Sequence, residues 1–261
     1  MPMLLRNANH WDRAIKRILH VGPPNSRKTT AFATYPRVMG YICSPGELGH
    51  STMPDAVDIT SIVWQHDQAV VESPRMVVEQ FEEAVKGFIG KEGVRTIAID
   101  GIHKLNPIYV AREAGGDLSQ VEEKDVPRVI AKGTDKLLAF LRQVMESDVE
   151  FVVCSAWDEY EKDDKLSKDK NAPQHLYPAL SGRGAKNSIG EFGMVLFHEP
   201  DSLVPGEYNI RTAPGGRVWG CGVKLPMEVA KRIPAVISAK DWKGWPTLDR
   251  LIFGDGKLSD K

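Results

Sequence analysis

The stretch RILHVGPPNSRKTT, residues 17–30, decides the fold of this chain. A short apolar run ends at Gly22, a polar loop follows, and residues 29–35 are typical of the start of a helix. The loop matches the phosphate-loop pattern G-x-x-x-x-G-K-[ST] at Gly22, Lys28 and Thr29. It departs from the pattern at Arg27, which stands where the second glycine is usual. An ordinary strand–turn–helix junction is the alternative interpretation.

The residue types in this loop suit phosphate binding. Backbone N–H groups at a helix N-terminus bind phosphate oxygens, and the helix dipole favours their negative charge. We expect Lys28 to reach the β- and γ-phosphates and the Thr29 hydroxyl to bind Mg²⁺. The predicted nucleotide-binding residues are Gly22, Pro23, Pro24, Asn25, Ser26, Arg27, Lys28, Thr29 and Thr30. Glycine permits a backbone conformation that a Cβ atom hinders, so Arg27 must tolerate that conformation or shift the loop.

A second candidate lies at the end of another apolar strand, TIAID at residues 96–100. In phosphate-loop enzymes an aspartate in this place holds Mg²⁺ beside the hydroxyl of the loop. Asp100 is therefore predicted to act with Lys28 and Thr29 in catalysis and metal binding. An aspartate that merely caps the next helix is the alternative.

Two further residues are candidates because they follow predicted strands. Glu47, after the strand at 38–43, is the proposed group that polarises the attacking water, and an exposed turn glutamate is the alternative. Ser155, at the tip of the strand FVVCSA (151–156), is a candidate sensor of the γ-phosphate, and a small buried residue is the alternative.

The rest of the chain predicts an α/β fold, with a mainly parallel central sheet, flanking helices and antiparallel edge strands near the C-terminus. Apolar runs predict the strands, and 3.6-residue spacing or a closing Trp-Pro pair predicts the helices. The predicted strands are 17–21, 38–43, 57–64, 94–100, 151–156, 194–198, 208–212 and 217–223, and the predicted helices are 74–89, 127–145 and one near 245–248. The charge run at 158–170 predicts a surface loop. We expect a core domain at 1–225 and a basic, tryptophan-bearing tail at 226–261 that packs on it.

Composition excludes several other classes. With 261 residues, 42% of them apolar, the chain can bury a large core, which excludes disorder as its main state. Its net charge of −1 excludes a globally basic nucleic-acid coat, although not a local basic face. No apolar run is long enough to span a bilayer or act as a secretory signal, so no membrane partner is expected. Cys43, Cys154 and Cys221 have no pairing or zinc spacing, which predicts buried thiols in the cytoplasm.

With these segments in order, the chain resembles the phage-encoded RecA-like, AAA-type ATPases that bind nucleotides and act in single-strand annealing. The segments that carry the resemblance are GPPNSRKTT (22–30), PGE (45–47), TIAIDG (96–101), FVVCSA (151–156), PALSGRGAKNSIGEFGMVLF (178–197) and YNIRTAP (208–214). The resemblance implies a RecA-like core, ATP and Mg²⁺ as ligands, assembly into a homo-oligomer and a role on single-stranded DNA in phage recombination or replication. It places the protein in the cytoplasm of the host cell, and a single-strand DNA-binding protein is a further candidate partner.

Two segments are candidates for contact with DNA or a neighbouring subunit. Residues 211–250 hold eight basic and three acidic residues, with Trp219, Trp242 and Trp245 among them, as single-stranded nucleic acid would require. A tail that packs its tryptophans on the core is the alternative. In the segment 181–186, Arg183 or Lys186 could reach a neighbour's γ-phosphate or touch DNA, and a plain surface loop is the alternative.

These observations predict an ATPase that hydrolyses ATP by in-line attack of water and engages single-stranded DNA. Two other functions stay open at this point. One is a nucleotide-gated binding module with little hydrolysis, for which Arg27 is the mark. The other is a small-molecule phosphotransferase such as a nucleotide kinase, which the absence of arginine from residues 158–170 disfavours.

Overall fold

The computed structural model of the chain describes residues 11–43, 63–65, 73–162, 174–181 and 184–254. In this part of the chain the strands form one nine-stranded sheet and a separate two-stranded arm. The large sheet consists of β1 (Arg17–Val21), β2 (Met39–Cys43), β3 (Val63–Gln65), β4 (Thr96–Asp100), β5 (Phe151–Ala156), β8 (Met194–Pro200), β9 (Tyr208–Arg211), β10 (Gly222–Val223) and β11 (Val236–Ile237). The arm pairs β6 (Asp158–Lys162) with β7 (Gln174–Pro178).

The strand order determines which loops meet at one edge of the sheet. The order is β11-β9-β8-β1-β5-β4-β2-β3, with β10 beside β8. All neighbours from β8 to β3 are parallel, whereas β9, β10 and β11 pair antiparallel. The predicted mainly parallel sheet with antiparallel strands toward the C-terminus is therefore confirmed. The carboxyl ends of β1, β5 and β4 are adjacent, and ligands of open parallel sheets bind at such ends.

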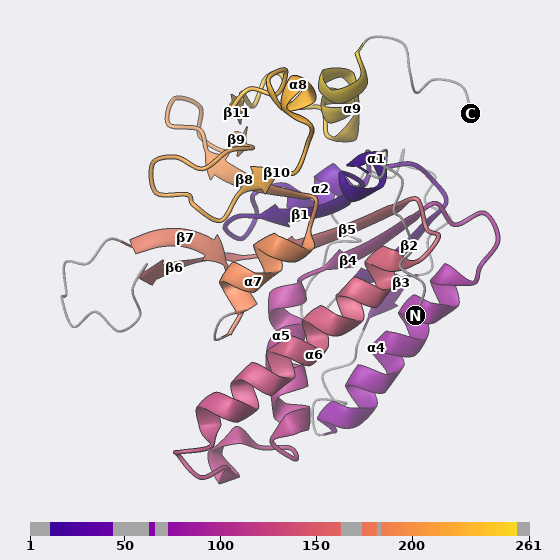
Figure 1. Cartoon of the computed structure of the whole chain (residues 1–261), viewed down its shortest axis with the longest axis vertical. Coiled ribbons are helices and arrows are strands. Elements are labelled where there is room, and N and C mark those ends of the chain that lie inside the picture. The colour runs from indigo at the N-terminus through magenta and orange to yellow at the C-terminus, as the bar shows by residue number, and fades with distance from the viewer. Residues whose placement is uncertain (1–10, 44–62, 66–72, 163–173, 182–183, 255–261) are drawn as a thin grey trace.

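Helices cover both faces of the sheet (Figure 1). One layer contains α4 (Pro74–Ile89), α5 (Ile102–Glu113) and α6 (Val126–Glu146), and the opposite layer contains α2 (Lys28–Phe32) and α9 (Trp245–Phe253). The remaining helices are α1 (Trp11–Ala14), α7 (Gly184–Glu191), α8 (Met227–Ala230) and a 3-10 turn at Leu118–Gln120. No helix among the described residues combines the length and the apolar character that crossing a membrane requires.

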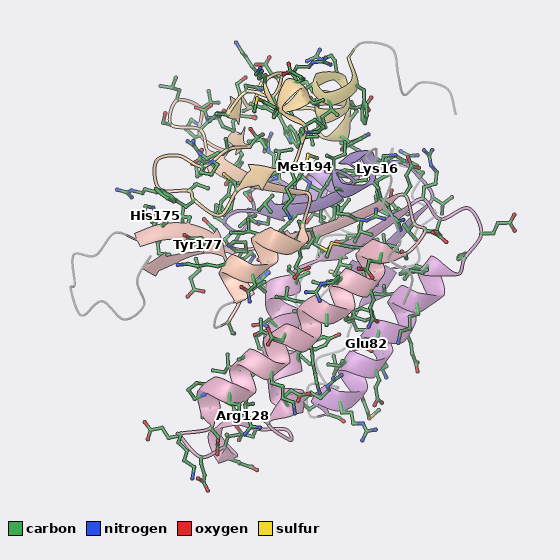
Figure 2. All side chains as sticks on the ribbon, in the orientation of Figure 1. Lys16, Glu82, Arg128, His175, Tyr177 and Met194 are labelled. Carbon is green, nitrogen blue, oxygen red and sulfur yellow. The ribbon has the colours of Figure 1, made fainter. Side chains whose placement is uncertain are left out.

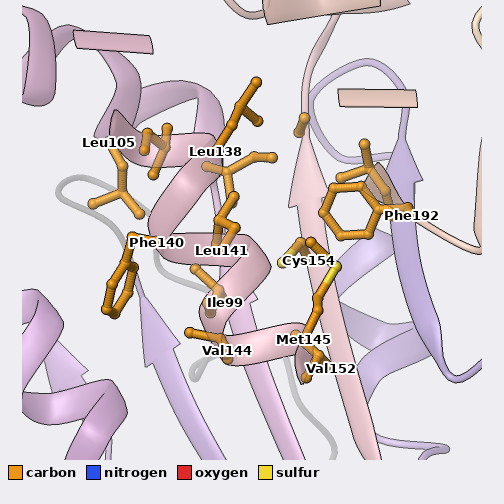
Figure 3. Close-up of a cluster of buried hydrophobic side chains, with 14 of the residues drawn as sticks. Ile99, Leu105, Leu138, Phe140, Leu141, Val144, Met145, Val152, Cys154 and Phe192 are labelled. Carbon is orange, nitrogen blue, oxygen red and sulfur yellow. The ribbon is translucent and has the colours of Figure 1, made fainter. Parts of the chain in front are cut away.

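Alternation along each strand assigns side chains to the two layers. On β5, Val152 and Cys154 join the core under α4–α6, whereas Phe151 and Val153 join the core under α2 and α9. Figure 3 shows the first of these cores, where the apolar stripe of α6 packs on β4 and β5. Gly133 lets α6 approach α5 closely, because a Cβ there would lie 2.6 Å from the Val110 Cα atom.

Four features of the local structure differ from what the sequence predicts. Residues 102–113 form a helix that the sequence did not reveal, because Pro107 lies inside it and polar Asn106 lies on its buried side. The charge run expected to be a loop begins as strand β6, whose partner β7 lies twelve residues farther along the chain. Only residues 222–223 of the expected strand at 217–223 are a strand. The basic loop expected at 181–186 continues from residue 184 as helix α7.

Candidate functional site

The loop between β1 and α2 begins at a glycine for steric reasons. A Cβ atom on Gly22 would lie 2.8 Å from the His198 carbonyl oxygen and 2.9 Å from Ser26 Oγ. The Gly22 N–H donates to the Ala156 carbonyl across 3.3 Å, which ties the loop to the end of β5. Within the loop the side chains of Ser26 and Lys28 are buried, whereas those of Pro24, Asn25, Arg27 and Thr30 are exposed and Pro23 is intermediate.

Arg27 adopts the conformation that a glycine would adopt. Its φ and ψ are 61° and 21°, in the left-handed region, directly before the first helical residue, Lys28. This conformation costs an L-residue roughly 1–2 kcal/mol relative to glycine. A left-handed residue next to a helical one turns successive N–H groups toward a common point and forms an anion-binding concavity. The loop therefore has the backbone shape of an anion site although it lacks the second glycine.

The Arg27 side chain extends to the turn between β8 and β9. Its Nη1 atom lies 3.1 Å from Glu207 Oε2, and both side chains are partly exposed. An exposed ion pair contributes about 0–1 kcal/mol, so it offsets only part of the backbone strain. The ion pair also keeps the Arg27 guanidinium group on the exposed side of the loop.

Lys28 folds back into the loop. Its Nζ donates to the carbonyl oxygens of Gly22 (2.8 Å) and Pro23 (2.7 Å) and to Ser26 Oγ (3.0 Å). Burying an ammonium group costs free energy, and an anion bound in the loop would lower that cost. The charge of Lys28 also helps burial to lower the pKa of His198, to about 3.

Asp100, at the carboxyl end of β4, is the centre of a buried hydroxyl cluster. Its Oδ2 accepts from Thr29 Oγ1 and from the Tyr41 hydroxyl, each at 2.7 Å, and its Oδ1 accepts from Ser155 Oγ. Ser155 Oγ in turn accepts from the Gly101 N–H at 2.8 Å. Burial, with Asp100 nearby, raises the pKa of Tyr41, so this phenol stays neutral and donates. The alternation of the strands explains the convergence, because these side chains all point to the α2 side of the sheet.

The cluster brings together residues 71 positions apart that sequence analysis had paired. Thr29 and Asp100 supply the hydroxyl and the carboxylate that a Mg²⁺ ion takes from a phosphate-loop protein, and phosphate and water supply the remaining oxygens. Among the described residues, no group of three or more His, Cys, Asp or Glu side chains could hold a metal by itself. This donor set fits a magnesium ion that is bound together with a phosphate ligand.

Ser155, the candidate sensor of the γ-phosphate, lies near the carboxyl end of β5, as the sequence predicts. It is buried against Asp100 and hydrogen-bonded to it, so its first contact is with the carboxylate. Sequence analysis missed Tyr41 and Glu207, because their approach to Asp100 and Arg27 depends on strand order and not on any local pattern. It also missed the buried pair His20 and His198 behind the loop. The candidates Glu47 and Arg183 lie outside the described residues.

Exposed aromatic side chains lie on and next to the β6–β7 arm, which follows β5 along the chain. Trp157 follows β5, and its ring stacks on the His103 ring with 4.5 Å between the ring centres. The Lys104 Nζ atom lies 5.2 Å from the centre of the Trp157 ring. Trp219 is 52% exposed and lies 4.6 Å from the His175 ring, and Tyr160 on β6 is 50% exposed. Figure 2 shows His175 and Tyr177 on the arm, which extends away from the main sheet.

The other two tryptophans of the basic segment have a structural role. Trp245 is buried against the rings of Tyr35 and Phe151, and Trp242 packs on the same core. For these two residues the alternative interpretation holds, in which the tail packs its tryptophans on the core. Their apolar surface packs against the core and holds the segment that ends in α9 in place. Lys186, the remaining finger candidate, is exposed on α7 with its Nζ 5.3 Å from the ring centre of Tyr177.

No family model matches the chain, and a search of curated proteins gives no match. All three cysteines are buried thiols that form no disulfide, as expected.

Proposed function

We propose that this chain is a RecA-like P-loop protein that binds ATP with Mg²⁺ and hydrolyses it while engaging single-stranded DNA. The observation that carries the proposal is the 2.7 Å contact between Thr29 Oγ1 and Asp100 Oδ2, beside a loop that buries the Lys28 ammonium group. A strand, an anion-binding loop, a lysine and a carboxylate in this order form the apparatus of phosphoryl transfer. The resemblance to phage RecA-like ATPases supports the same conclusion.

Each residue has a distinct part in this proposal. The N–H groups from residue 27 onward bind phosphate oxygens, Lys28 exchanges its loop carbonyl oxygens for the β- and γ-phosphates, and Arg27 adds a second positive charge. Thr29 and Asp100 would hold the magnesium ion, which would neutralise charge on the phosphate oxygens. Tyr41 and Ser155 keep the Asp100 carboxylate in place. Glu47 stays the candidate for activating water.

The aromatic side chains around the arm support single-stranded DNA as the partner. Bases stack on exposed aromatic rings whatever the sequence, and nearby cations attract the phosphates. Trp157, Tyr160 and Trp219 supply such rings, and Lys104 and Lys186 supply positive charge. Trp157 directly follows β5, whose residue Ser155 contacts Asp100. This continuity gives the nucleotide site a short path to the DNA surface.

The first experiment is equilibrium binding of ATP with Mg²⁺ to the native chain and to Lys28→Ala. Charge-assisted hydrogen bonds contribute about 1.5–3 kcal/mol each, so we expect affinity to fall by at least about tenfold. The matched control is Lys86→Ala, which removes an exposed lysine of α4 that pairs with Glu82. Equal affinity in the native chain and Lys28→Ala would remove the phosphate-loop assignment.

The second experiment measures the affinity for labelled single-stranded DNA with and without ATP. Loss of one stacked base costs about 1–3 kcal/mol, so Trp219→Ala should weaken binding by about 5- to 150-fold. Met227→Ala is the control, since Met227 is 72% exposed and apolar and lies on α8, which Figure 1 shows apart from the β6–β7 arm. Equal loss in both variants would contradict the proposed DNA surface.

Release of phosphate in the same samples separates the proposal from its rivals. Turnover stimulated by DNA supports the ATPase. Tight ATP binding without turnover would identify a nucleotide-gated binding module, which the strained Arg27 favours. Transfer of phosphate to a nucleoside or nucleotide would identify a phosphotransferase.

A further inference from the structure

Two buried histidines connect the phosphate loop to the interior. His198 Nδ1 lies 2.8 Å from the Ser26 carbonyl oxygen, and its Nε2 lies 2.8 Å from His20 Nδ1. His20 Nε2 lies 2.8 Å from the Tyr35 hydroxyl. His20 and His198 are on the adjacent strands β1 and β8, and both are almost fully inaccessible to solvent.

The Ser26 carbonyl group at one end and the Tyr35 hydroxyl group at the other determine which atom donates in each of these hydrogen bonds. A carbonyl oxygen only accepts, so His198 Nδ1 carries the proton. Burial lowers the pKa of both histidines, with Lys28 nearby reinforcing the effect, so each ring carries one proton. His198 Nε2 is therefore an acceptor, His20 Nδ1 donates to it, and His20 Nε2 accepts from Tyr35. Burial raises the pKa of Tyr35, which keeps this final donor protonated.

The hydrogen bond from His198 Nδ1 to the Ser26 carbonyl oxygen holds the peptide group that precedes Arg27. The C=O and N–H groups of a trans peptide point in opposite directions. When His198 holds the Ser26 carbonyl toward β8, the Arg27 N–H points away from β8. The φ angle of Arg27, which is 61°, is the rotation about its N–Cα bond, and the Ser26–Arg27 peptide plane forms the N-terminal side of that bond. Holding this plane therefore helps to fix φ. A glycine would adopt this φ without support, whereas an arginine requires it.

We propose that His198, held by His20 and Tyr35, is a positioning residue that keeps the Ser26–Arg27 peptide in its anion-binding orientation and so replaces the missing second glycine. This inference rests on the proposed function, because the anion is the phosphate chain of ATP. It makes the effect of His198 depend on which residue occupies position 27. An ordinary buried histidine would contribute stability but would show no such dependence.

Three substitutions of His198 separate its two contacts. His198→Asn places an amide nitrogen near the Nδ1 position and keeps a donor for Ser26, whereas His198→Gln reaches toward His20 and removes that donor. His198→Leu removes both contacts. Thermal unfolding of each variant establishes that it is folded at the temperature of the binding assay. His198→Gln serves as the test variant if His198→Leu does not fold.

The experiment is a double-mutant cycle with ATP and Mg²⁺ as the ligand, in the native chain and in the Arg27→Gly background. With Arg27 present, we expect His198→Leu and His198→Gln to weaken ATP binding by about tenfold or more and His198→Asn to weaken it by less than about threefold. In the Arg27→Gly background we expect all three variants to lie within about threefold of their parent. Equal losses in both backgrounds, or no loss in either, would overturn the inference.

The outcomes distinguish this inference from the proposed function. If the native chain binds ATP and Lys28→Ala does not, but the His198 variants bind as the native chain does, the inference alone fails. If neither the native chain nor Lys28→Ala binds ATP, the proposed function fails and the inference fails with it.

Discussion

The left-handed conformation at Arg27 can be tested by the sign of one stability difference. Arg27→Ala and Arg27→Gly both remove the guanidinium group and its 3.1 Å ion pair with Glu207, so they differ only in the Cβ atom. At φ 61° and ψ 21° that atom costs roughly 1–2 kcal/mol. Glycine loses about 0.5–1 kcal/mol more conformational entropy on folding. The difference lies between about 0 and 1.5 kcal/mol, so we expect Arg27→Gly to be more stable than Arg27→Ala by about 0.7 kcal/mol.

The assay is urea unfolding, with the free energy of unfolding extrapolated to water for each variant. The control is the same pair of substitutions at Glu83, an exposed residue in the middle of α4. There alanine should be the more stable by about 1 kcal/mol, because an ordinary helical position favours it. If alanine were also the more stable residue at position 27, the strained anion-binding loop described above would be refuted.

Three further predictions address other parts of the structure. Tyr41→Phe removes the 2.7 Å hydrogen bond to the Asp100 carboxylate and should lower the free energy of unfolding by about 1–2 kcal/mol in urea titrations. Glu113 should make the stability of the native chain depend on pH in acid. Burial raises the pKa of Glu113, but hydrogen bonds from Lys136 and Lys132 outweigh burial and lower this pKa from 4.5 to about 2. Stability is then fully present above pH 4.5 and is lost as the pH falls toward 2, and Lys136→Met should flatten this part of the pH profile of the unfolding temperature. Gly133→Ala should destabilise the chain by about 1–3 kcal/mol, since the new Cβ would lie 2.6 Å from the α5 backbone, and a calorimetric melt as stable as that of the native chain would contradict the close packing of α5 on α6.

Local patterns were sufficient to predict the main architecture. The helix at Pro74–Ile89 and the strands Arg17–Val21 and Phe151–Ala156 have the bounds expected from apolar spacing alone. Helix α5 was missed because its interior proline and its buried Asn106 contradict the helical pattern. Asn106 is accommodated there by a 2.9 Å hydrogen bond to Thr134 of α6, a partner that no local reading could supply.

In the candidate site too, local sequence patterns indicate some residues, whereas the contacts of others depend on the tertiary fold. Lys28, Thr29 and Asp100 are candidates from the sequence because each belongs to a recognisable strand or loop pattern, and the structure brings Thr29 and Asp100 into contact. The hydrogen bonds of Tyr41 to Asp100 and of His198 to Ser26 could not be expected, since they depend on strand order and on which face of the sheet each residue occupies. Trp219 and Trp245 differ in burial although both lie in one basic segment, because packing and not composition decides which ring is covered.

The most direct test of the central claim is the position of a bound metal. Crystals grown with Mn²⁺ and a non-hydrolysable ATP analogue would give an anomalous peak at the metal. The account predicts this peak about 2–2.3 Å from Thr29 Oγ1 and adjacent to the Asp100 carboxylate, with the triphosphate wrapped by residues 22–29. An analogue bound elsewhere, or a metal with no contact to Thr29 or Asp100, would contradict it.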